Sequence, residues 1–148
     1  MALFCCSTLL SPVVEAQQAQ SAEADALTVI RGRAVCLDES GRPANALFDC
    51  AHQTSGYGVV DKDSKLYKLD PANPSTAIFT DARVRARELQ VMARVDAKKQ
   101  LELIKVQSIK EGRLYDIYYF CQICNIRAYA PGPCPCCRNE LEFRETPA

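Results

Sequence analysis

Two short cysteine pairs near the C-terminus constrain this chain more than any other feature of its sequence. Cys121 and Cys124 form the first pair, and Cys134 and Cys137 form the second, nine residues further along. Each pair lets two sulfur atoms reach one metal ion from a tight turn whose amide groups hydrogen-bond to the thiolates. Four soft thiolates in a tetrahedron suit Zn²⁺ or a single iron ion. The spacing therefore predicts one metal ion held by these four residues, and disulfide pairing in an oxidising compartment is the alternative.

The segment around these pairs resembles two known types of metal-binding sequence. Tyr119–Glu145 is similar to rubredoxin-like zinc ribbons. Its second half is similar to short bacterial heavy-metal-binding segments with the pattern P-G-x-C-P-x-C-G-M-x-L, which Pro131–Cys137 and Leu141 match. Arg138-Asn139 replaces the Gly-Met of that pattern, and a ligand histidine usual in the first half is absent. The resemblance implies a zinc ribbon over residues 119–145 and, from its second half, a role in transition-metal sensing or transport.

The residues after each pair favour zinc over iron. A rubredoxin-type iron site usually has glycine there, whereas this chain has Asn125 and Arg138. Asn tolerates the left-handed backbone conformation of such turns, and Arg does so less readily. Zinc would also supply folding free energy to a segment that is too small for a core of its own. Iron stays open as the alternative cofactor. The fifth cysteine, Cys136, does not fit the spacing and is expected to be an ordinary thiol.

The middle of the chain consists of short stretches rich in β-branched residues, separated by turn signals. Five or six short strands with a bulge favour a small barrel over a layered α/β fold. We therefore predict a mainly β chain, with a barrel over residues 28–118. A partly helical reading of residues 82–113 stays open, because that run also has helical spacing. The predicted strands are Thr28–Leu37, Gly56–Val60, Lys65–Leu69, Val84–Val95, Leu101–Ile109 and Leu114–Phe120.

The same region resembles small exported bacterial proteins with an OB-like fold. In that group a first strand of the type G-x-V-x-D/C precedes a cysteine-containing loop, a hairpin of the type G-x-V-x-D-x-D-G-K-L-Y and a later strand. The glycine usual in the later strand is replaced here around Ala93. The resemblance implies an OB-like β-barrel. The matching positions are Gly32, Cys36, Cys50, Gly58, Lys65-Leu66-Tyr67 and Val91.

Cys36, Cys50 and His52 form a second group of candidate site residues. A disulfide between Cys36 and Cys50 is the simplest prediction for an exported protein. Two buried free thiols, or a second metal or haem-contacting site that includes His52, are the alternatives. His52 is the only histidine of the chain, which excludes a catalytic site built on several histidines. No nucleophile–base arrangement or phosphate-binding glycine loop is visible, so we expect no enzymatic activity.

Residues 1–27 predict a signal peptide or an N-terminal apolar tail. The apolar stretch 2–14 is too short to span a bilayer, and small residues suited to cleavage follow it. A basic residue before this stretch, usual in signal peptides, is absent. We expect a periplasmic or otherwise exported protein without a transmembrane span in its mature chain. A cytoplasmic location is the alternative.

These features together predict a non-catalytic, metal-stabilised binding or assembly protein, such as an accessory subunit of a cell-envelope complex. We expect its partner to be a protein, such as a subunit of a membrane complex. A rubredoxin-like iron electron-transfer protein is one alternative, and a nucleic-acid-binding OB barrel with a zinc ribbon is another. The basic stretch 83–113 favours the latter, but the zero net charge and the few aromatic residues suited to base stacking disfavour it.

The connection between the two predicted parts has no linker residues. Leu114–Phe120 runs directly into Cys121 without an intervening Gly, Pro or Ser. We therefore expect the last strand to continue into the metal-binding segment. Alternation places Tyr118 and Phe120 on one face of this strand, and we expect them, with Leu141, to pack against the barrel.

Overall fold

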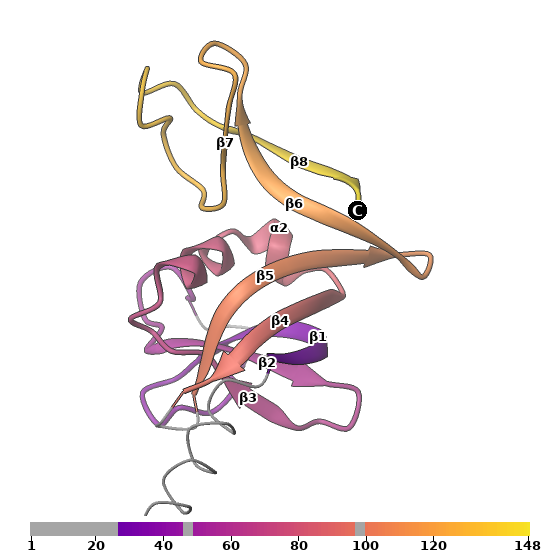
Figure 1. Ribbon diagram of the computed structural model, residues 1–148. Coiled ribbons are helices and arrows are strands. Elements are labelled where there is room, and N and C mark those ends of the chain that lie inside the picture. The colour runs from indigo at the N-terminus through magenta and orange to yellow at the C-terminus, as the bar shows by residue number, and fades with distance from the viewer. Residues whose placement is uncertain (1–26, 46–48, 97–99) are drawn as a thin grey trace, which may run out of the picture.

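The computed structural model describes residues 27–45, 49–96 and 100–148 (Figure 1). The segment 1–26, with Cys5 and Cys6, and the turn expected at 97–99 lie outside the described residues. No helix within the described ranges is long and apolar enough to cross a bilayer. The elements are β1 (Leu27–Leu37), β2 (Gly56–Asp61), β3 (Leu66–Lys68), η1 (Pro74–Thr80), α2 (Ala82–Arg85), β4 (Leu89–Val95), β5 (Leu101–Lys110), β6 (Arg113–Cys121), β7 (Ile126–Ala128) and β8 (Glu142–Pro147).

The strands form one antiparallel sheet, so the chain is mainly β as predicted. Their order is β3-β2-β1-β4-β5-β6-β7, and β8 pairs with β6. Tyr115 and Asp116 of β6 pair with both β5 and β8, which places these two strands on opposite edges of β6. Figure 1 shows β1–β5 as the lower body, from which β6 rises to meet β7 and β8. The short helical elements η1 and α2 lie between these two parts.

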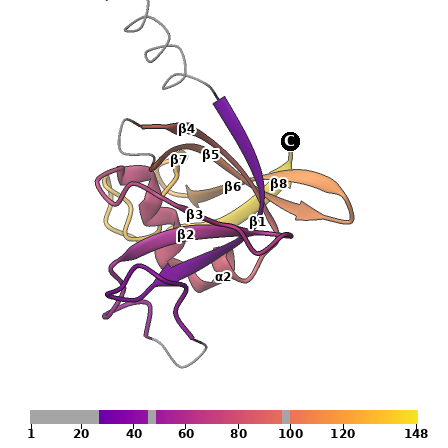
Figure 2. The ribbon, with the colours of Figure 1, turned by 90° about the horizontal axis from the view of Figure 1, so that it is seen from below.

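The core fills the curved body formed by β1–β5 and continues past η1 and α2 to β6 and the cysteine loops. Residues 89, 91 and 93 of β4 are fully buried and alternate with partly or largely exposed neighbours, as expected for a strand with one face in the core. Strand β1 crosses the body, as seen from below in Figure 2, and pairs with β2 along one half and with β4 along the other. The two halves meet at Gly32, where an added Cβ would lie 2.1 Å from the carbonyl oxygen of Val60. Glycine is therefore required at the point where β1 passes from one partner to the other.

The sheet is open, so the closed barrel predicted for residues 28–118 is not formed. Strand β3 has only three residues, and Leu69, which follows it, contacts β5 through one isolated parallel bridge to Leu101. The amide of Asp70 bonds to the carbonyl of Leu101, after which the chain leaves through Pro71 into η1. One bridge does not make a ladder between the two edges. The sheet curls without closing.

The strand predicted at Val84–Val95 is shorter than expected. Helix α2 occupies its first residues, with the side chain of Asp81 accepting a hydrogen bond from the amide of Arg83, and β4 starts only at Leu89. Glu88 therefore lies at the passage from helix to strand, which interrupts the apolar alternation along the predicted strand. The β-bulge lies further along, where Ile104 is an extra residue opposite β4.

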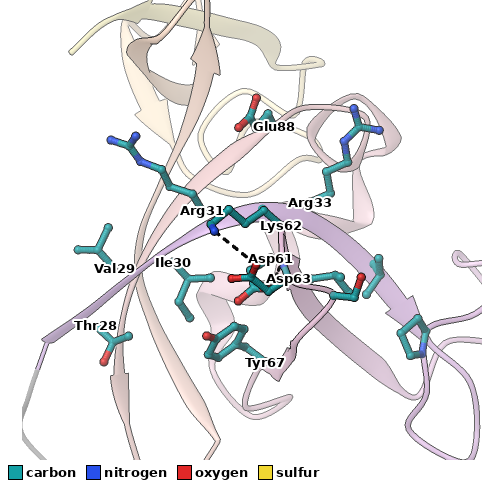
Figure 3. A pocket seen from close by; sticks show the side chains of 15 residues that line it. Thr28, Val29, Ile30, Arg31, Arg33, Asp61, Lys62, Asp63, Tyr67 and Glu88 are labelled. Atoms are coloured by element: carbon teal, nitrogen blue, oxygen red, sulfur yellow. Dashed lines mark hydrogen bonds and ion pairs between the residues drawn. The ribbon is translucent and has the colours of Figure 1, made fainter.

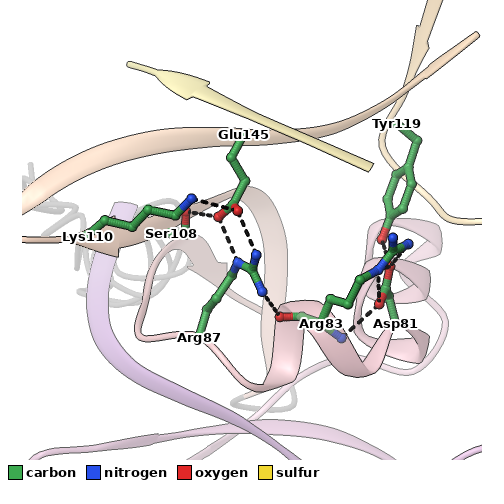
Figure 4. Close-up of polar contacts among 7 residues, drawn as sticks. All are labelled: Asp81, Arg83, Arg87, Ser108, Lys110, Tyr119 and Glu145. Carbon is green, nitrogen blue, oxygen red and sulfur yellow. Dashed lines mark hydrogen bonds and ion pairs between the residues drawn. The ribbon is translucent and has the colours of Figure 1, made fainter. Parts of the chain in front are cut away.

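A buried carboxylate joins the last strand to the body of the sheet (Figure 4). The side chain of Glu145 in β8 is 7% exposed and forms two bonds of 2.7 Å with the guanidinium group of Arg87. Ser108 donates a third hydrogen bond, and the ammonium group of Lys110 lies at 2.8 Å. Burial raises the pKa of Glu145, but the bonds from Arg87, Lys110 and Ser108 outweigh it and hold this pKa to about 2. This network fixes β8 over the start of β4 and the end of β5.

Tyr119 makes the second contact between the two parts of the molecule. Its ring is buried against Phe143, and its hydroxyl group donates a hydrogen bond of 2.9 Å to the carboxylate of Asp81. The expectation that Tyr118 and Phe120 make this contact is wrong, because these rings lie on the opposite face, under Arg127 and Arg144. Leu141 does belong to the apolar core, as expected.

Replacing Glu145 with Gln should destabilise the protein by on the order of 2–3 kcal/mol at neutral pH, because Arg87 and Lys110 lose their shared anion. The pKa of Glu145 in the folded protein lies below the ordinary glutamate value of 4.5. Its stabilising contribution is therefore complete above the unfolded pKa and is lost as the pH falls toward about 2. Denaturant unfolding should show the gap between wild type and Glu145→Gln shrinking from pH 5 to pH 2.

Glu142→Gln is the matched control, because Glu142 lies on the same strand with a side chain that is 51% exposed. Its effect should stay within about 0.5 kcal/mol at every pH. Equal effects of the two substitutions would contradict the importance of the buried network.

Candidate metal centre

The four paired cysteines come from two loops that flank β7. Cys121 is the last residue of β6, and Cys124 lies in the turn that leads into β7. Cys134 and Cys137 lie in the loop between β7 and β8, which an isolated bridge from Pro133 to Glu140 closes. The antiparallel pairing of β6 with both β7 and β8 thus brings the two loops to the same end of the sheet.

The sulfur atoms of these four cysteines form one compact cluster. All four lie within 4.8 Å of one another, and those of Cys121 and Cys137 are 3.5 Å apart. Zinc–thiolate bonds of about 2.3 Å place the sulfur atoms of a tetrahedral site about 3.8 Å apart. Cys121 and Cys134 are buried, and the other two are partly exposed. The donor set, its number and its spacing therefore fit one tetrahedral metal ion.

Backbone amides support the thiolates within each pair. The amide of Cys124 donates to the sulfur of Cys121 at 3.4 Å. Bonds from the amides of Cys137 and Cys136 lower the pKa of the Cys134 thiol to about 7. In the second turn the amide of Arg138 also donates to the carbonyl of Cys134 at 2.9 Å. The amide bonds to the sulfurs of Cys121 and Cys134 stabilise negative charge there, which a metal-binding thiolate requires, while the bond from Arg138 closes the turn.

Both turns use the left-handed backbone conformation expected after each pair. The φ angle is 54° at Asn125 and 64° at Arg138. Asn adopts this conformation readily, whereas a side chain such as Arg raises its energy by on the order of 1 kcal/mol. The second turn therefore forms despite an unfavourable residue, as strained backbone does at sites that other contacts hold in place.

Cys136 lies beside the cluster without belonging to it. Its side chain is exposed, and its sulfur is not among the four that lie together. Hydrogen bonding with the thiol of Cys136 is the main cause that raises the pKa of Cys124. Cys136 is therefore an exposed fifth thiol beside Cys124, one of the two partly exposed members of the cluster.

The structure brings Cys36 and Cys50 together but leaves His52 apart from them. The two cysteines form a disulfide with a Cα–Cα distance of 5.8 Å. The imidazole of His52 faces solvent, 2.8 Å from the carboxylate of Asp49, and this bond lowers the pKa of Asp49. Of the alternatives considered for this group, the disulfide is the one that the geometry supports.

A shallow groove of about 1120 Å³ lies beside β1 and the β2–β3 hairpin (Figure 3). Its charged side chains have both signs and balance one another, so the groove favours no class of charged ligand. The carboxylate of Asp61 accepts bonds from the amides of Asp63 and Lys65 and thereby shapes the hairpin turn. The charged residues are Arg31, Arg33, Asp61, Lys62, Asp63 and Glu88.

Comparison with known proteins yields no protein family, curated protein or solved structure that matches this chain. The two resemblances found in the sequence therefore stay interpretations. No sequence pattern pointed to the pairs of residues that attach the metal centre to the body, which are Glu145 with Arg87 and Tyr119 with Asp81. For Tyr119 alone the sequence held a signal: alternation along β6 places it on the face opposite Tyr118 and Phe120.

Titration with Co²⁺ should reveal one tetrahedral thiolate site per chain, because four sulfur ligands give intense charge-transfer and d–d absorption. The absorption should saturate at one equivalent of metal and disappear in Cys134→Ser. Cys136→Ser is the matched control and should leave the spectrum and the stoichiometry unchanged. Loss of the site in Cys136→Ser would show that this thiol is a ligand.

Replacing Arg138 with Gly should stabilise the metal-bound protein by on the order of 1 kcal/mol, since glycine adopts a positive φ angle without strain. Asn125→Gly should have a smaller effect, because Asn already tolerates this conformation. Thermal unfolding of the metal-bound forms measures both. A destabilised Arg138→Gly variant would show that the side chain of Arg138 makes a contact that outweighs its strain.

Proposed function

We propose that this chain is a non-catalytic binding and assembly protein whose C-terminal segment is stabilised by zinc. The cluster of four cysteine sulfurs is the observation that carries this proposal. Structural zinc sites use four protein ligands and leave no open position for a substrate. A closed four-thiolate site therefore suits a structural role better than a catalytic one.

Zinc is preferred to iron because of how the site is embedded. The segment between β7 and β8 has few buried residues apart from Cys134, so a metal ion would supply the free energy that orders it. Rubredoxin-like electron transfer remains the second candidate, because the amide bonds to Cys121 and Cys134 also suit an iron–thiolate site. Colourless protein with one equivalent of zinc supports the first proposal, and red protein that contains iron supports the second.

The proposed location is outside the cytoplasm, where the protein would serve as an accessory subunit of a cell-envelope complex. The disulfide between Cys36 and Cys50 supports an oxidising compartment. The apolar segment at residues 2–14 supports export. A nucleic-acid partner is disfavoured, because charges of both signs line the groove beside β1 and β2.

Removal of the metal tests this function directly. Because Cys121 ends the strand that carries Tyr119, loss of the metal should loosen the contact of Tyr119 with Asp81 as well as the cysteine loops. Chelation should therefore lower the melting temperature of the whole protein, and one equivalent of Zn²⁺ should restore it.

The control is Cys136→Ser, which should respond to chelation and to added zinc as the wild type does. A main unfolding transition that stays at the same temperature after chelation would contradict the proposal. The metal centre would then be a separate unit with no effect on the rest of the sheet.

A further inference from the structure

The sheet opens between β5 and β6, and a cleft lies at this opening. The ladder between the two strands ends at the pair Gln107–Asp116, after which β6 pairs with β7 on the same edge from Tyr119 onward. Figure 1 shows β6 leaving β5 and rising toward β7. The cleft has a volume of about 420 Å³, within the range of sites that hold small ligands or peptide side chains.

The cleft runs along strand edges and not across a sheet face. Residues 103–106 of β5 and residues 116–118 of β6 line it without interruption. Successive side chains of a strand point to opposite faces, so consecutive residues line one cavity only where it lies along the edge. The 70–73 loop covers the first part of this edge, where the carbonyl of Leu103 accepts a bond from Asn73. The remainder of the edge opens into the cleft.

The bulge in β5 turns an apolar side chain outward at the mouth of this cleft. Ile104 is the extra residue of the bulge and is 44% exposed. Tyr129, which follows β7 and also lines the cleft, is 65% exposed. The strand register places Val29 beside Met92, and Met92 beside Lys105, on the same outer face. An apolar strip therefore leads from the start of β1 into the cleft, and its members are Leu27, Val29, Met92, Ile104 and Tyr129.

Two basic side chains, Lys105 and Arg127, line the cleft beside this apolar strip. Arg127 lies over the ring of Tyr118 at 4.5 Å on the cleft wall, while Lys105 forms an ion pair of 2.8 Å with Asp116. Among the charged side chains that line the cleft, two basic groups thus face one carboxylate, and they complement an acidic group on whatever binds there.

We propose that this cleft and strip bind an extended peptide segment of a partner protein, with large apolar side chains flanked by acidic residues. The open edge of β5 suits an extended chain, the apolar walls suit its side chains, and Arg127 suits an adjacent carboxylate. Met92, Ile104 and Tyr129 of the strip line a concave cleft, which favours a peptide over a flat membrane surface. This inference rests on the proposed binding function and names the class of its partner.

Selection from a displayed random dodecapeptide library against the zinc-loaded full chain tests the inference. The selected peptides should combine large apolar residues with Asp or Glu. Their affinity, measured by fluorescence anisotropy, should fall at least about tenfold in Ile104→Glu and in Arg127→Glu. Ile123→Glu is the matched control, because Ile123 is 71% exposed in the first cysteine turn, outside the cleft, and it should leave affinity unchanged.

Three results would overturn the inference: no enriched peptides, enriched peptides without acidic residues, or equal binding by wild type and Ile104→Glu. Binding of vesicles of phosphatidylglycerol that Ile104→Glu abolishes, with no peptide selected, would assign the face to a membrane instead. The melting temperature of each variant should be measured to verify that the variant remains folded. A zinc-dependent melting temperature with no peptide binding would reject this inference alone and leave the stabilising role of the metal standing.

Discussion

Strand β6 belongs to both parts of the molecule, and the rest of the structure depends on its continuity. On one edge its first half pairs with β5 in the body and its end pairs with β7 beside the metal centre, while β8 pairs along the other edge from Tyr115 to Phe120. The strand ends at Cys121, a member of the cysteine cluster, two residues after Tyr119, which bonds to Asp81. Movement of the cysteine cluster therefore displaces a residue that is packed into the core.

The chain places opposite chemical demands on its cysteines. Cys36 and Cys50 are joined as a disulfide, whereas the cluster needs four free thiolates to bind a metal. Burial of Cys121 and Cys134 and bonding to a metal ion both protect thiolates from oxidation. A metal bound early would therefore let both states exist in one oxidising compartment. Among the free thiols of the described residues, Cys136 is exposed and outside the cluster, and it is the one that oxidants reach first.

Local sequence patterns predicted some parts of this fold well. The spacing of the cysteine pairs identified the four sulfurs that cluster, and the absence of a linker after Phe120 identified the strand that continues into Cys121. The strands predicted at Gly56–Val60 and Lys65–Leu69, with four polar residues between them, correspond to the β2–β3 hairpin. Each of these features depends on residues close together in the sequence, so one short pattern is enough to reveal it.

Long-range features escaped prediction for the same physical reason. Arg87 and Glu145 lie 58 residues apart, and neither carries a local pattern that names its partner. Whether a curled sheet closes depends on how many residues of β3 face β5, and composition does not reveal that number. The short helix at 82–85 was obscured because its apolar spacing merges with that of β4.

Hydrogen–deuterium exchange with and without the metal tests the continuity of β6 most directly. Removal of zinc should speed exchange in the cysteine loops, and also at the amides of residues 113–119 and of the β5 residues paired with them. This spread is expected because the metal, Tyr119 and the β5–β6 ladder share one strand. Faster exchange confined to residues 121–141, with unchanged protection in β5 and the first half of β6, would contradict this account.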